Sequence, residues 1–275
     1  MSDKNQTIKI IIASHKKYRM PDDEMYIPVL VGAELKKEQS DSDLYSEYRK
    51  DNTGENISAK NLSFCELTGL YWAWKNLTAD YIGLVHYRRY FSVQRKRKQD
   101  KWDCILTSDQ AQKLCEKYDI ILPQKRRYYI ETLYSHYEHT HYKEHLDTSR
   151  HIIAEQCPAY LESFDKVLKQ RSGYMFNMYL MKKKLSDEYC TWLFDILFEL
   201  EKRVDIADLS QFQGRFYGRV SEILLNVWLH QKLLEQPDLK VKVIGCIHME
   251  PVRWKDKTIA FLKAKFLGEK YSQSF

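Results

Sequence analysis

The residues best suited to chemistry stand directly after short apolar runs, where strands of an α/β sheet would end. His86, Tyr87, Arg88 and Arg89 follow the apolar run Tyr81–Val85. In open α/β sheets, ligands bind just beyond the carboxyl ends of the strands. Guanidinium groups bind phosphates through two parallel hydrogen bonds, and imidazoles also bind anions. The sequence therefore predicts an anion site at the end of this strand.

A second polar cluster follows the first apolar run of the chain. Ser14, His15 and Lys16 come directly after Ile8–Ala13, a continuous apolar segment of strand length. Two strands that both end in basic or hydrogen-bonding groups favour one shared crevice.

A carboxylate and an amide are candidates further along the chain. Ser221 is predicted to cap a helix that runs to Leu234, which places Glu222 in the first turn, where the helix dipole favours an ionised side chain. Asn226 lies one turn on, on the same face. Asn177 lies inside a predicted strand, 173–181, so its amide either forms a hydrogen bond in the core or contacts a ligand.

Other chemically suggestive residues favour plainer interpretations. Asp41-Ser42-Asp43 could bind a metal, but it lies in the charged segment 34–55, which predicts a mobile surface loop. Residues 95–98 are basic and predict a solvated loop. His141 and His145 are four residues apart, as zinc ligands on a helix can be, yet no HExxH motif or cysteine pair accompanies them.

The elements that position these residues alternate between strand and helix, which indicates an α/β fold. Ser63 and Glu66 fit a capping box, followed by an apolar helix face and the buried strand 81–85. Further predicted strands cover 102–106, 119–123 and 241–247, and predicted helices cover 108–118, 130–146, 149–170 and 186–203.

Composition limits the class of protein. The 275 residues suffice for one large domain or two small ones, and the net charge of +6 suits a phosphorylated ligand or an anionic membrane surface better than nucleic acid. The six cysteines show no metal spacing, which is typical of reduced thiols. No signal peptide and no apolar run of about 20 residues is present, so a cytoplasmic location is expected.

The sequence resembles a known family in several blocks. Residues 55–91, ENISAKNLSFCELTGLYWAWKNLTADYIGLVHYRRYF, are similar to the core motif of a bacterial family that is described as a domain of unknown function and occurs in capsule and exopolysaccharide gene clusters. YDIILPQKRRYYIETLYSHY, GYMFNMYLMKK and GRVSEILLNVWL resemble its later blocks. The resemblance runs from Ile8 to about Arg253.

The resemblance implies a glycosyltransferase. Members of that family are regarded as enzymes of the GT-A type, a Rossmann-like mixed sheet flanked by helices, and some are assigned as galactofuranosyltransferases. A UDP-sugar donor and a glycan acceptor on a polyprenyl lipid are then expected, in capsule, exopolysaccharide or O-antigen synthesis. The expected donor-binding residues are Ser14, His15, Lys16, Asn56, Ser58, Asn61, Asp80, His86, Tyr87, Arg88 and Arg89. The expected acceptor-binding residues are His136, Asn177, Met178, Ser221 and Glu222.

The expected mechanism is an inverting sugar transfer without a metal. His86, Arg88 and Arg89 stand where most GT-A enzymes carry an Asp-x-Asp metal motif, and they would neutralise the diphosphate leaving group. No cofactor is expected. Glu222 is the first candidate for the general base, with Glu66 and Asp80 behind it.

Two other functions stay open. One is a non-catalytic glycan-binding or scaffold subunit of a polysaccharide assembly complex, and the weaker one is a nucleic-acid-binding protein that uses the basic loops. The expected domain covers residues 1–253 and has a helical C-terminal portion. The tail 254–275 is basic and amphipathic, so it either lies on the inner face of the plasma membrane or docks on the domain.

Overall fold

The computed structural model describes residues 6–36, 45–94, 100–251, 263–265, 268 and 270–271. The chain divides into two compact units that interleave along the sequence. Unit 1 comprises Met1–Gln124, Asn177–Cys190 and Asp238–Glu250, and unit 2 comprises Lys125–Phe176, Thr191–Pro237 and Pro251–Phe275.

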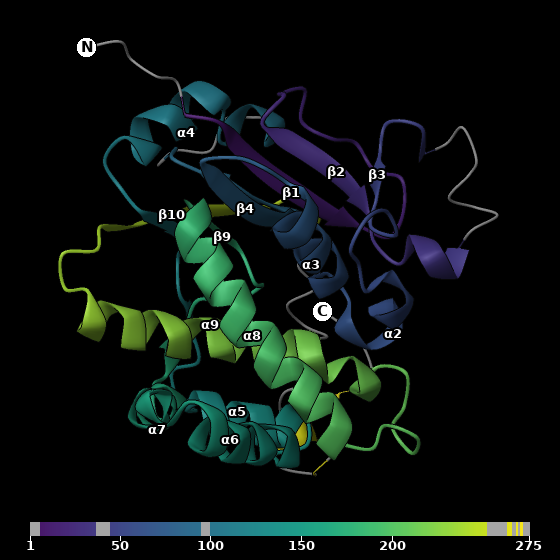
Figure 1. The fold of residues 1–275 in the computed structure, drawn as a ribbon, viewed down its shortest axis with the longest axis vertical. Coiled ribbons are helices and arrows are strands. Elements are labelled where there is room, and N and C mark those ends of the chain that lie inside the picture. The colour runs from purple at the N-terminus through teal and green to yellow at the C-terminus, as the bar shows by residue number, and fades with distance from the viewer. Residues whose placement is uncertain are drawn as a thin grey trace. The chain divides into compact units, whose positions relative to one another are not determined.

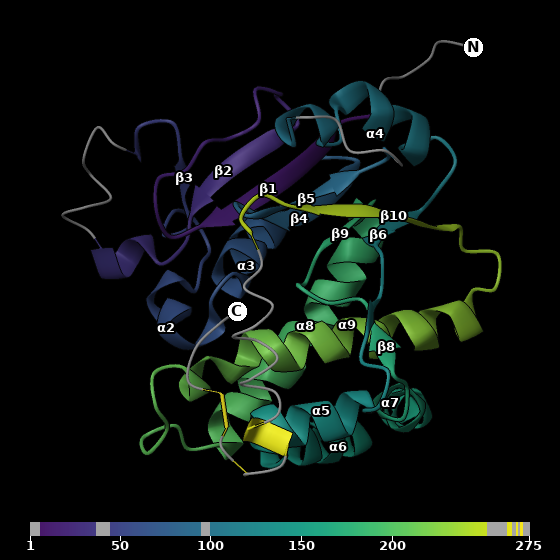
Figure 2. The same ribbon diagram turned by 180° about the vertical axis from the view of Figure 1, so that it is seen from behind.

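Unit 1 is built on one mixed sheet of eight strands. Their order is β3-β2-β1-β4-β5-β10-β6-β9, and β9 also pairs with β4. Figure 1 shows β1 to β4 side by side, and Figure 2 shows β10 next to β5 and β6. The strands are β1 (Ile8–Ser14), β2 (Tyr26–Leu30), β3 (Arg49–Lys50), β4 (Tyr81–His86), β5 (Arg89–Ser92), β6 (Ile120–Pro123), β9 (Tyr179–Lys182) and β10 (Val241–His248).

The strand directions bring several carboxyl ends to one edge of this sheet. β2, β1 and β4 are mutually parallel, as are β10 and β6, whereas β5 and β9 run antiparallel to their neighbours. Five strands end at the same edge of the sheet: β1, β2, β4, β6 and β10. We call this edge the carboxyl edge. The central strands β1 and β4 are buried, which explains their continuous apolar sequences.

One helix packs closely on one face of the sheet. In α3 (Leu67–Asn76), a Cβ atom at Gly69 would lie 2.9 Å from Val31, so the glycine permits the helix to pack closely on Val31, which follows β2, while Ile11 of β1 would be in ordinary contact at 3.7 Å. α4 (Ser108–Cys115) begins with a capping box formed by Thr107 and Gln110. We call the side of the sheet that carries Ile11 the α3 face.

Several predicted elements of unit 1 differ from the structure. Ser63 does not cap a helix with Glu66, because α2 (Asn61–Phe64) ends at Cys65, whose φ is 54°, and α3 starts anew at Leu67. The predicted strand 102–106 contains a short 3-10 helix, η4 (Trp102–Cys104). The segment 34–55, predicted to be a mobile loop, contains β3 and a fully buried Asp51. Asp41-Ser42-Asp43 and residues 95–98 lie outside the described residues.

Unit 2 is mainly helical. It contains α5 (Leu133–Thr140), α6 (Glu144–Gln156), α7 (Leu161–Leu168), α9 (Phe216–Glu235) and the part of α8 (Lys183–Arg203) that follows Cys190. α9 is buried on most of its circumference and packs against α7 and α6. A two-stranded ribbon, β7 (Arg126–Arg127) with β8 (Ser172–Gly173), completes the unit.

Three predictions for this part of the chain are wrong in detail. The helix expected over 130–146 is split into α5 and α6, with the break at His141. The strand expected over 173–181 is two strands, β8 and β9, separated by a turn in which Phe176 and Asn177 both have positive φ. α9 begins at Phe216, so Ser221 is not its N-cap and Glu222 lies in its second turn. The predicted dipole effect on Glu222 is therefore absent.

None of the helices in the described part of the chain is both long and apolar enough to cross a membrane.

Candidate functional site

The two polar clusters predicted at strand ends meet at the carboxyl edge of unit 1. β1 and β4 are adjacent and parallel, with Ala13 opposite His86. The ring of Tyr87 contacts the ring of His15 edge-on at 5.4 Å, and the Lys16 ammonium lies 5.3 Å from the centre of the Tyr87 ring. The buried hydroxyl of Ser14 donates to the backbone oxygen of Lys16 at 2.5 Å and so shapes this turn. The structure confirms that the ends of these two strands lie together.

A row of three basic side chains crosses the strands at this edge. His86 is paired with Arg89 across the turn that joins β4 to β5, and Arg89 is paired with His248 of β10. Directly paired residues of neighbouring strands project from the same face of a sheet. Leu84 pairs with Ile11 of the α3 face, and His86 is two residues further along β4, so all three side chains belong to that face. We call His86, Arg89 and His248 the cationic row.

Arg88 has different surroundings from Arg89. Its guanidinium group forms an ion pair with Glu250 at 3.1 Å, and both side chains are more than a third exposed. Tyr18 also hydrogen bonds this carboxylate, and partial burial together with the charge of Glu250 raises the pKa of Tyr18. The guanidinium carbon lies 5.2 Å from the centre of the Tyr87 ring. Arg88 thus already has an acidic partner on the segment that follows β10.

A carboxylate and an amide are joined at the same edge. Asn177 is 1% exposed and directly precedes Met178 and β9, and its amide donates to Glu66 at 2.8 Å. Glu66 immediately precedes α3 and is partly exposed. The left-handed φ of 54° at Asn177 directs its side chain into this contact and away from a regular strand. Glu66 is therefore held in a fixed position near strand ends that carry basic groups.

A buried aspartate organises the loops that reach this edge. Asp51 accepts hydrogen bonds from the backbone of Gly32 and Ala33 and from the hydroxyls of Ser58 and Thr68. Such a carboxylate, fully enclosed and accepting four hydrogen bonds, has a clear structural role. The loops after β2 and β3 and the first turn of α3 are tied together through it.

Three residues predicted to bind the donor belong to these tied loops. The hydroxyl of Ser58 donates to Asp51, and Asn61 donates to the backbone of Cys65 and to Thr68. Asn56 accepts from the backbone of Ser58. Their contact with a donor stays a prediction, and the structure shows the role of each in the loop.

Two more predicted residues are not members of the cationic row. Asp80 precedes β4 at the end opposite His86, where it accepts from the backbone of Thr7 at 2.7 Å. Met178 is fully buried, and its sulfur lies 4.0 Å from that of Cys246.

The predicted acceptor residues of unit 2 form a local network on α9. Glu222 is 6% exposed and lies 3.5 Å from Arg219, while the Ser221 hydroxyl donates to Gly218 of the preceding turn. Asn226 lies one turn after Glu222, as predicted, and clamps both backbone groups of Tyr174 at 2.8 Å. Asn226 thereby fixes the chain after β8.

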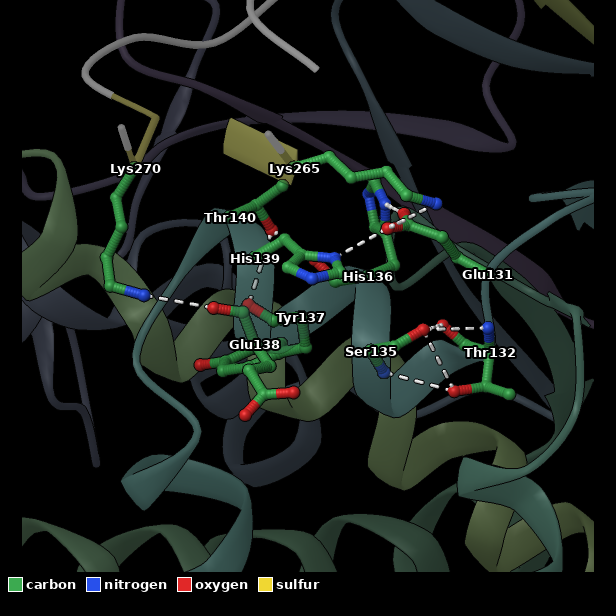
Figure 3. A network of polar contacts seen from close by, with 10 residues as sticks. All are labelled: Glu131, Thr132, Ser135, His136, Tyr137, Glu138, His139, Thr140, Lys265 and Lys270. Atoms are coloured by element: carbon green, nitrogen blue, oxygen red, sulfur yellow. Dashed lines mark hydrogen bonds and ion pairs between the residues drawn. The ribbon is translucent and has the colours of Figure 1, made fainter. Parts of the chain in front are cut away.

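His136 belongs to a second network, drawn in Figure 3. The buried carboxylate of Glu131 binds Nδ1 of His136 at 2.8 Å and Nδ1 of His139 at 2.6 Å, and Lys265 lies 3.8 Å from it. The hydrogen bonds from these two imidazoles hold the pKa of Glu131 below its usual range, against the effect of burial.

The pair His141 and His145 has protein partners. Nδ1 of His141 bonds Gln213 at 2.9 Å, and Nδ1 of His145 bonds the Tyr137 hydroxyl at 2.9 Å. Burial lowers the pKa of His141 to about 3 and that of His145 to about 4. In the described part of the chain, no three His, Cys, Asp or Glu side chains are grouped so that they could hold a metal ion.

The structure also adds residues that the sequence did not single out. His248, Glu250 and Tyr18 reach the carboxyl edge because β10 inserts between β5 and β6, and because the chain after β1 folds over Tyr87. His248-Met249-Glu250 follows the predicted strand 241–247, so the strand-end rule used for His86 pointed to these residues as well. No comparable pattern marks Asp51.

Comparison with known proteins assigns the family. The family described as a domain of unknown function, DUF4422, matches residues 9–233. The chain belongs to this family. None of the curated proteins matches the chain.

A solved structure shares the fold. The apo structure of WbbM, a bifunctional glycosyltransferase, superposes on this DUF4422 chain with a TM-score of 0.79 at 28% sequence identity. The match covers 89% of this chain and 46% of WbbM, so the chain spans about half the length of that protein. The mixed α/β fold of this chain is thus similar to that of one part of a glycosyltransferase.

Proposed function

We propose that this chain is a glycosyltransferase that moves a sugar from a UDP-sugar to a hydroxyl group of a glycan acceptor. The proposal is supported by the similarity to part of WbbM at 28% identity over 89% of this chain. It is also supported by membership of the DUF4422 family. The resemblance of the four sequence blocks to this kind of family implies a glycosyltransferase activity. Galactofuranose is the first sugar to test, and capsule, exopolysaccharide or O-antigen synthesis is the proposed process.

The cationic row is the observation that carries this proposal. A nucleotide diphosphate carries about two negative charges, and departure of the sugar concentrates charge on it. An opposite charge about 4 Å away contributes roughly 4 kcal/mol in a partly desolvated site, before the cost of desolvation. The pairing of Arg89 with His86 and His248 at the carboxyl edge supports binding of such a group there.

The aromatic groups beside the row suit the rest of the donor. Tyr87 is 6% exposed and contacts the rings of His15 and Tyr18 edge-on. The exposed His15 and Lys16 extend the basic surface from β4 to β1. A donor that binds along the ends of these two strands would place its phosphates near Arg89 and its nucleoside near His15.

The transfer requires a general base for the acceptor hydroxyl if the enzyme inverts the sugar configuration. Glu222 is the proposed base from the sequence, and it lies in unit 2 beside Arg219. Glu66 is the competing candidate, because the structure holds it at the carboxyl edge of unit 1. Loss of turnover in only one of the two glutamine variants would decide between them.

The donor is proposed to bind without a divalent metal, since basic side chains occupy the strand end where a metal-binding acidic pair would be expected. The proposed acceptor is carried on a polyprenyl lipid, which requires peripheral contact with the inner face of the plasma membrane.

The deciding experiment measures UDP binding by calorimetry and turnover of a panel of UDP-sugars that includes UDP-galactofuranose, with a lipid-linked acceptor. Both are measured with excess EDTA and with Mn²⁺. We expect binding and turnover to survive EDTA. Turnover that disappears with EDTA and returns with Mn²⁺ would contradict the metal-independent mechanism. Absence of UDP binding under both conditions would favour the non-catalytic glycan-binding subunit instead.

A further inference from the structure

Unit 2 exposes two neighbouring apolar side chains at the tip of a short loop. Tyr129 is 76% exposed and Ile130 is 64% exposed, both in the connection between β7 and α5. Single exposed apolar residues are common on protein surfaces. Two consecutive large apolar side chains at a loop tip, next to the two arginines of β7, are less common than a single exposed apolar residue.

The backbone holds this tip in a defined shape. Tyr128 donates its backbone N–H to Arg171, and Leu133 donates to Gln170, so both ends of the loop are fastened to the segment before β8. The Arg171 guanidinium donates to the backbone oxygen of Tyr129 at 3.3 Å. Tyr129 has a φ of 56°, which costs a non-glycine residue some strain. The loop therefore presents these two side chains in a fixed arrangement.

Comparison with the preceding tyrosine shows that the exposure is specific. Tyr128 packs inward, with its ring 4.3 Å from that of His136 and 4.9 Å from the Arg126 guanidinium. Burial raises the pKa of Tyr128 to about 12. Of two consecutive tyrosines, the fold thus partly buries one and exposes the other together with Ile130.

Exposed basic residues belong to the segments that hold the tip. In the ribbon, Arg126 pairs with Gly173, and a Cβ at Gly173 would lie 3.3 Å from both Asn226 and Leu133, so this pair faces inward. Arg127 pairs with Ser172 and therefore faces the other way. Arg127, Arg171 and Lys169 are all exposed.

We propose that Tyr129, Ile130, Arg127, Lys169 and Arg171 form a docking surface for an anionic phospholipid bilayer. An aromatic and an aliphatic side chain can enter the interface between headgroups and acyl chains, while cations beside them bind anionic headgroups. The charge complementarity selects an anionic bilayer over a neutral one. This binding does not depend on the transfer reaction, so it stands or falls separately from the proposed function.

The described part of the C-terminal tail contacts other protein groups. Lys270 donates to the backbone oxygens of Glu138 and His141, and Tyr271 donates to Thr140, so both dock on α5 and the turn after it. Lys265 lies 3.8 Å from the buried carboxylate of Glu131 at the base of the loop. Tyr129 and Ile130 stay exposed beside these contacts.

Vesicle co-sedimentation of the full chain tests the surface. Vesicles of equal parts phosphatidylcholine and phosphatidylglycerol are compared with pure phosphatidylcholine. We expect binding to the anionic vesicles and about tenfold weaker binding after Tyr129→Ser with Ile130→Ser. Arg127→Gln and Lys169→Gln should each weaken binding about fivefold, and added salt should reduce the difference.

The matched controls lie in unit 1. Leu62→Ser removes a side chain that is 64% exposed, as Ile130 is, and Lys113→Gln removes one exposed cation of α4. Circular dichroism verifies the fold of each variant. No vesicle binding by the full chain, equal loss in the control variants, or unchanged binding in the loop variants would each overturn the proposal. The same holds if Arg127→Gln weakens oligonucleotide binding and leaves vesicle binding unchanged, since the surface would then serve nucleic acid.

Discussion

Arg88 and Arg89 are neighbours in the sequence but have different roles in the structure. Arg88 forms a partly exposed ion pair with Glu250, an interaction whose contribution is usually small. Arg89 is paired in the sheet with His86 on one side and His248 on the other. Arg88 lies in the turn between β4 and β5, outside the strand pairing, so only Arg89 joins the cationic row.

This difference predicts unequal effects on donor binding. Arg89→Ala should weaken UDP binding by about tenfold to a hundredfold, the usual scale for a hydrogen bond to a charged group. Arg88→Ala should weaken it by much less, because its guanidinium is shared with Glu250. Calorimetric titration with UDP measures the affinity of both alanine variants. Arg89→Lys is added as a variant that keeps the positive charge and loses the bidentate geometry. Equal losses in the two alanine variants would show that Arg88 contacts the donor as well.

The two candidate bases predict opposite outcomes for a pair of isosteric variants. If Glu222 is the base, Glu222→Gln should keep UDP binding and lower turnover about a hundredfold or more. Glu66→Gln should then have a smaller effect, because the Asn177 amide can still hydrogen bond the new side chain. Single-turnover kinetics with saturating donor distinguishes the two. Near-normal turnover in Glu222→Gln, with loss in Glu66→Gln, would assign the base to the carboxyl edge of unit 1.

The buried imidazoles of unit 2 predict a dependence of stability on pH. Burial depresses the pKa of His145 to about 4, with a further lowering by Lys270 opposed by Glu144. In the unfolded chain the ordinary value of 6.5 applies. Below about pH 6.5 the unfolded state therefore binds a proton that the folded state excludes, so stability falls as the pH falls. Above that pH both states are neutral and the effect vanishes.

The size of this effect is measurable by urea unfolding at two pH values. Between about pH 7.5 and about pH 5, His145→Gln should lose about 2 kcal/mol less stability than the unchanged chain. The absolute stability of the variant also changes, since the imidazole stacks on Phe216 at 3.7 Å, so the difference between the pH values is the quantity to compare. His151→Gln, which removes an exposed imidazole of the same unit, is the control, and a difference as large as that of His145→Gln would contradict the assignment to His145.

At the scale of elements, the pairing of β4 with β9 depends on a glycine. A Cβ at Gly83 would lie 2.8 Å from the backbone oxygen of Tyr179 and 3.1 Å from Ile10. Backbone cannot move aside as a flexible side chain can, so Gly83→Ala should destabilise the chain by about 2 kcal/mol. Thermal unfolding measures the loss. Gly214→Ala is the control, because nothing lies within 4 Å of a Cβ there, and a similar loss in that variant would contradict the explanation.

The sequence predicted those elements that have a clear hydrophobic pattern of their own. β1, β4, β6, β10 and α8 are continuous apolar runs or complete helical stripes, and each lies within a few residues of its predicted bounds. The joint position of His15 and His86 followed from the rule that parallel strands end at one edge.

The missed features depend on contacts between distant segments. β5 is basic and aromatic, and it becomes a strand because Arg89 to Ser92 pair with β10. The break at Asn177 depends on the contact with Glu66, and the burial of Asp51 depends on donors from three other segments. A pattern within one window of sequence carries no information on such partners.

At the scale of the whole molecule, the two units are interleaved in the sequence. Unit 1 takes β9 and β10 from segments that follow parts of unit 2. The family match ends at residue 233, before β10 begins at Val241. The last strand therefore lies outside the matched region, although it occupies the interior of the sheet between β5 and β6.

This arrangement predicts the effect of shortening the chain. A chain cut after Glu235 retains the whole matched region but leaves β5 and β6 without β10, and it loses His248 from the cationic row. We expect it to be insoluble or to unfold without a cooperative transition. A chain cut after Glu250 keeps β10 and should retain cooperative unfolding of unit 1. Circular dichroism melting compares the two, and cooperative melting with UDP binding in the shorter chain would contradict this account.

The interior position of β10 also has a consequence during protein synthesis. The ribosome makes β4, β5 and β6 long before His248, so the hydrogen-bonding edges of β5 and β6 have no partner strand while most of the chain is being translated. The carboxyl edge is complete only when translation has passed Pro237, because two of its segments, at Asn177 and at His248, are made late. Such pairing between distant segments folds slowly. The edges of β5 and β6 that later pair with β10 are thus open to pairing with other chains until β10 has been made.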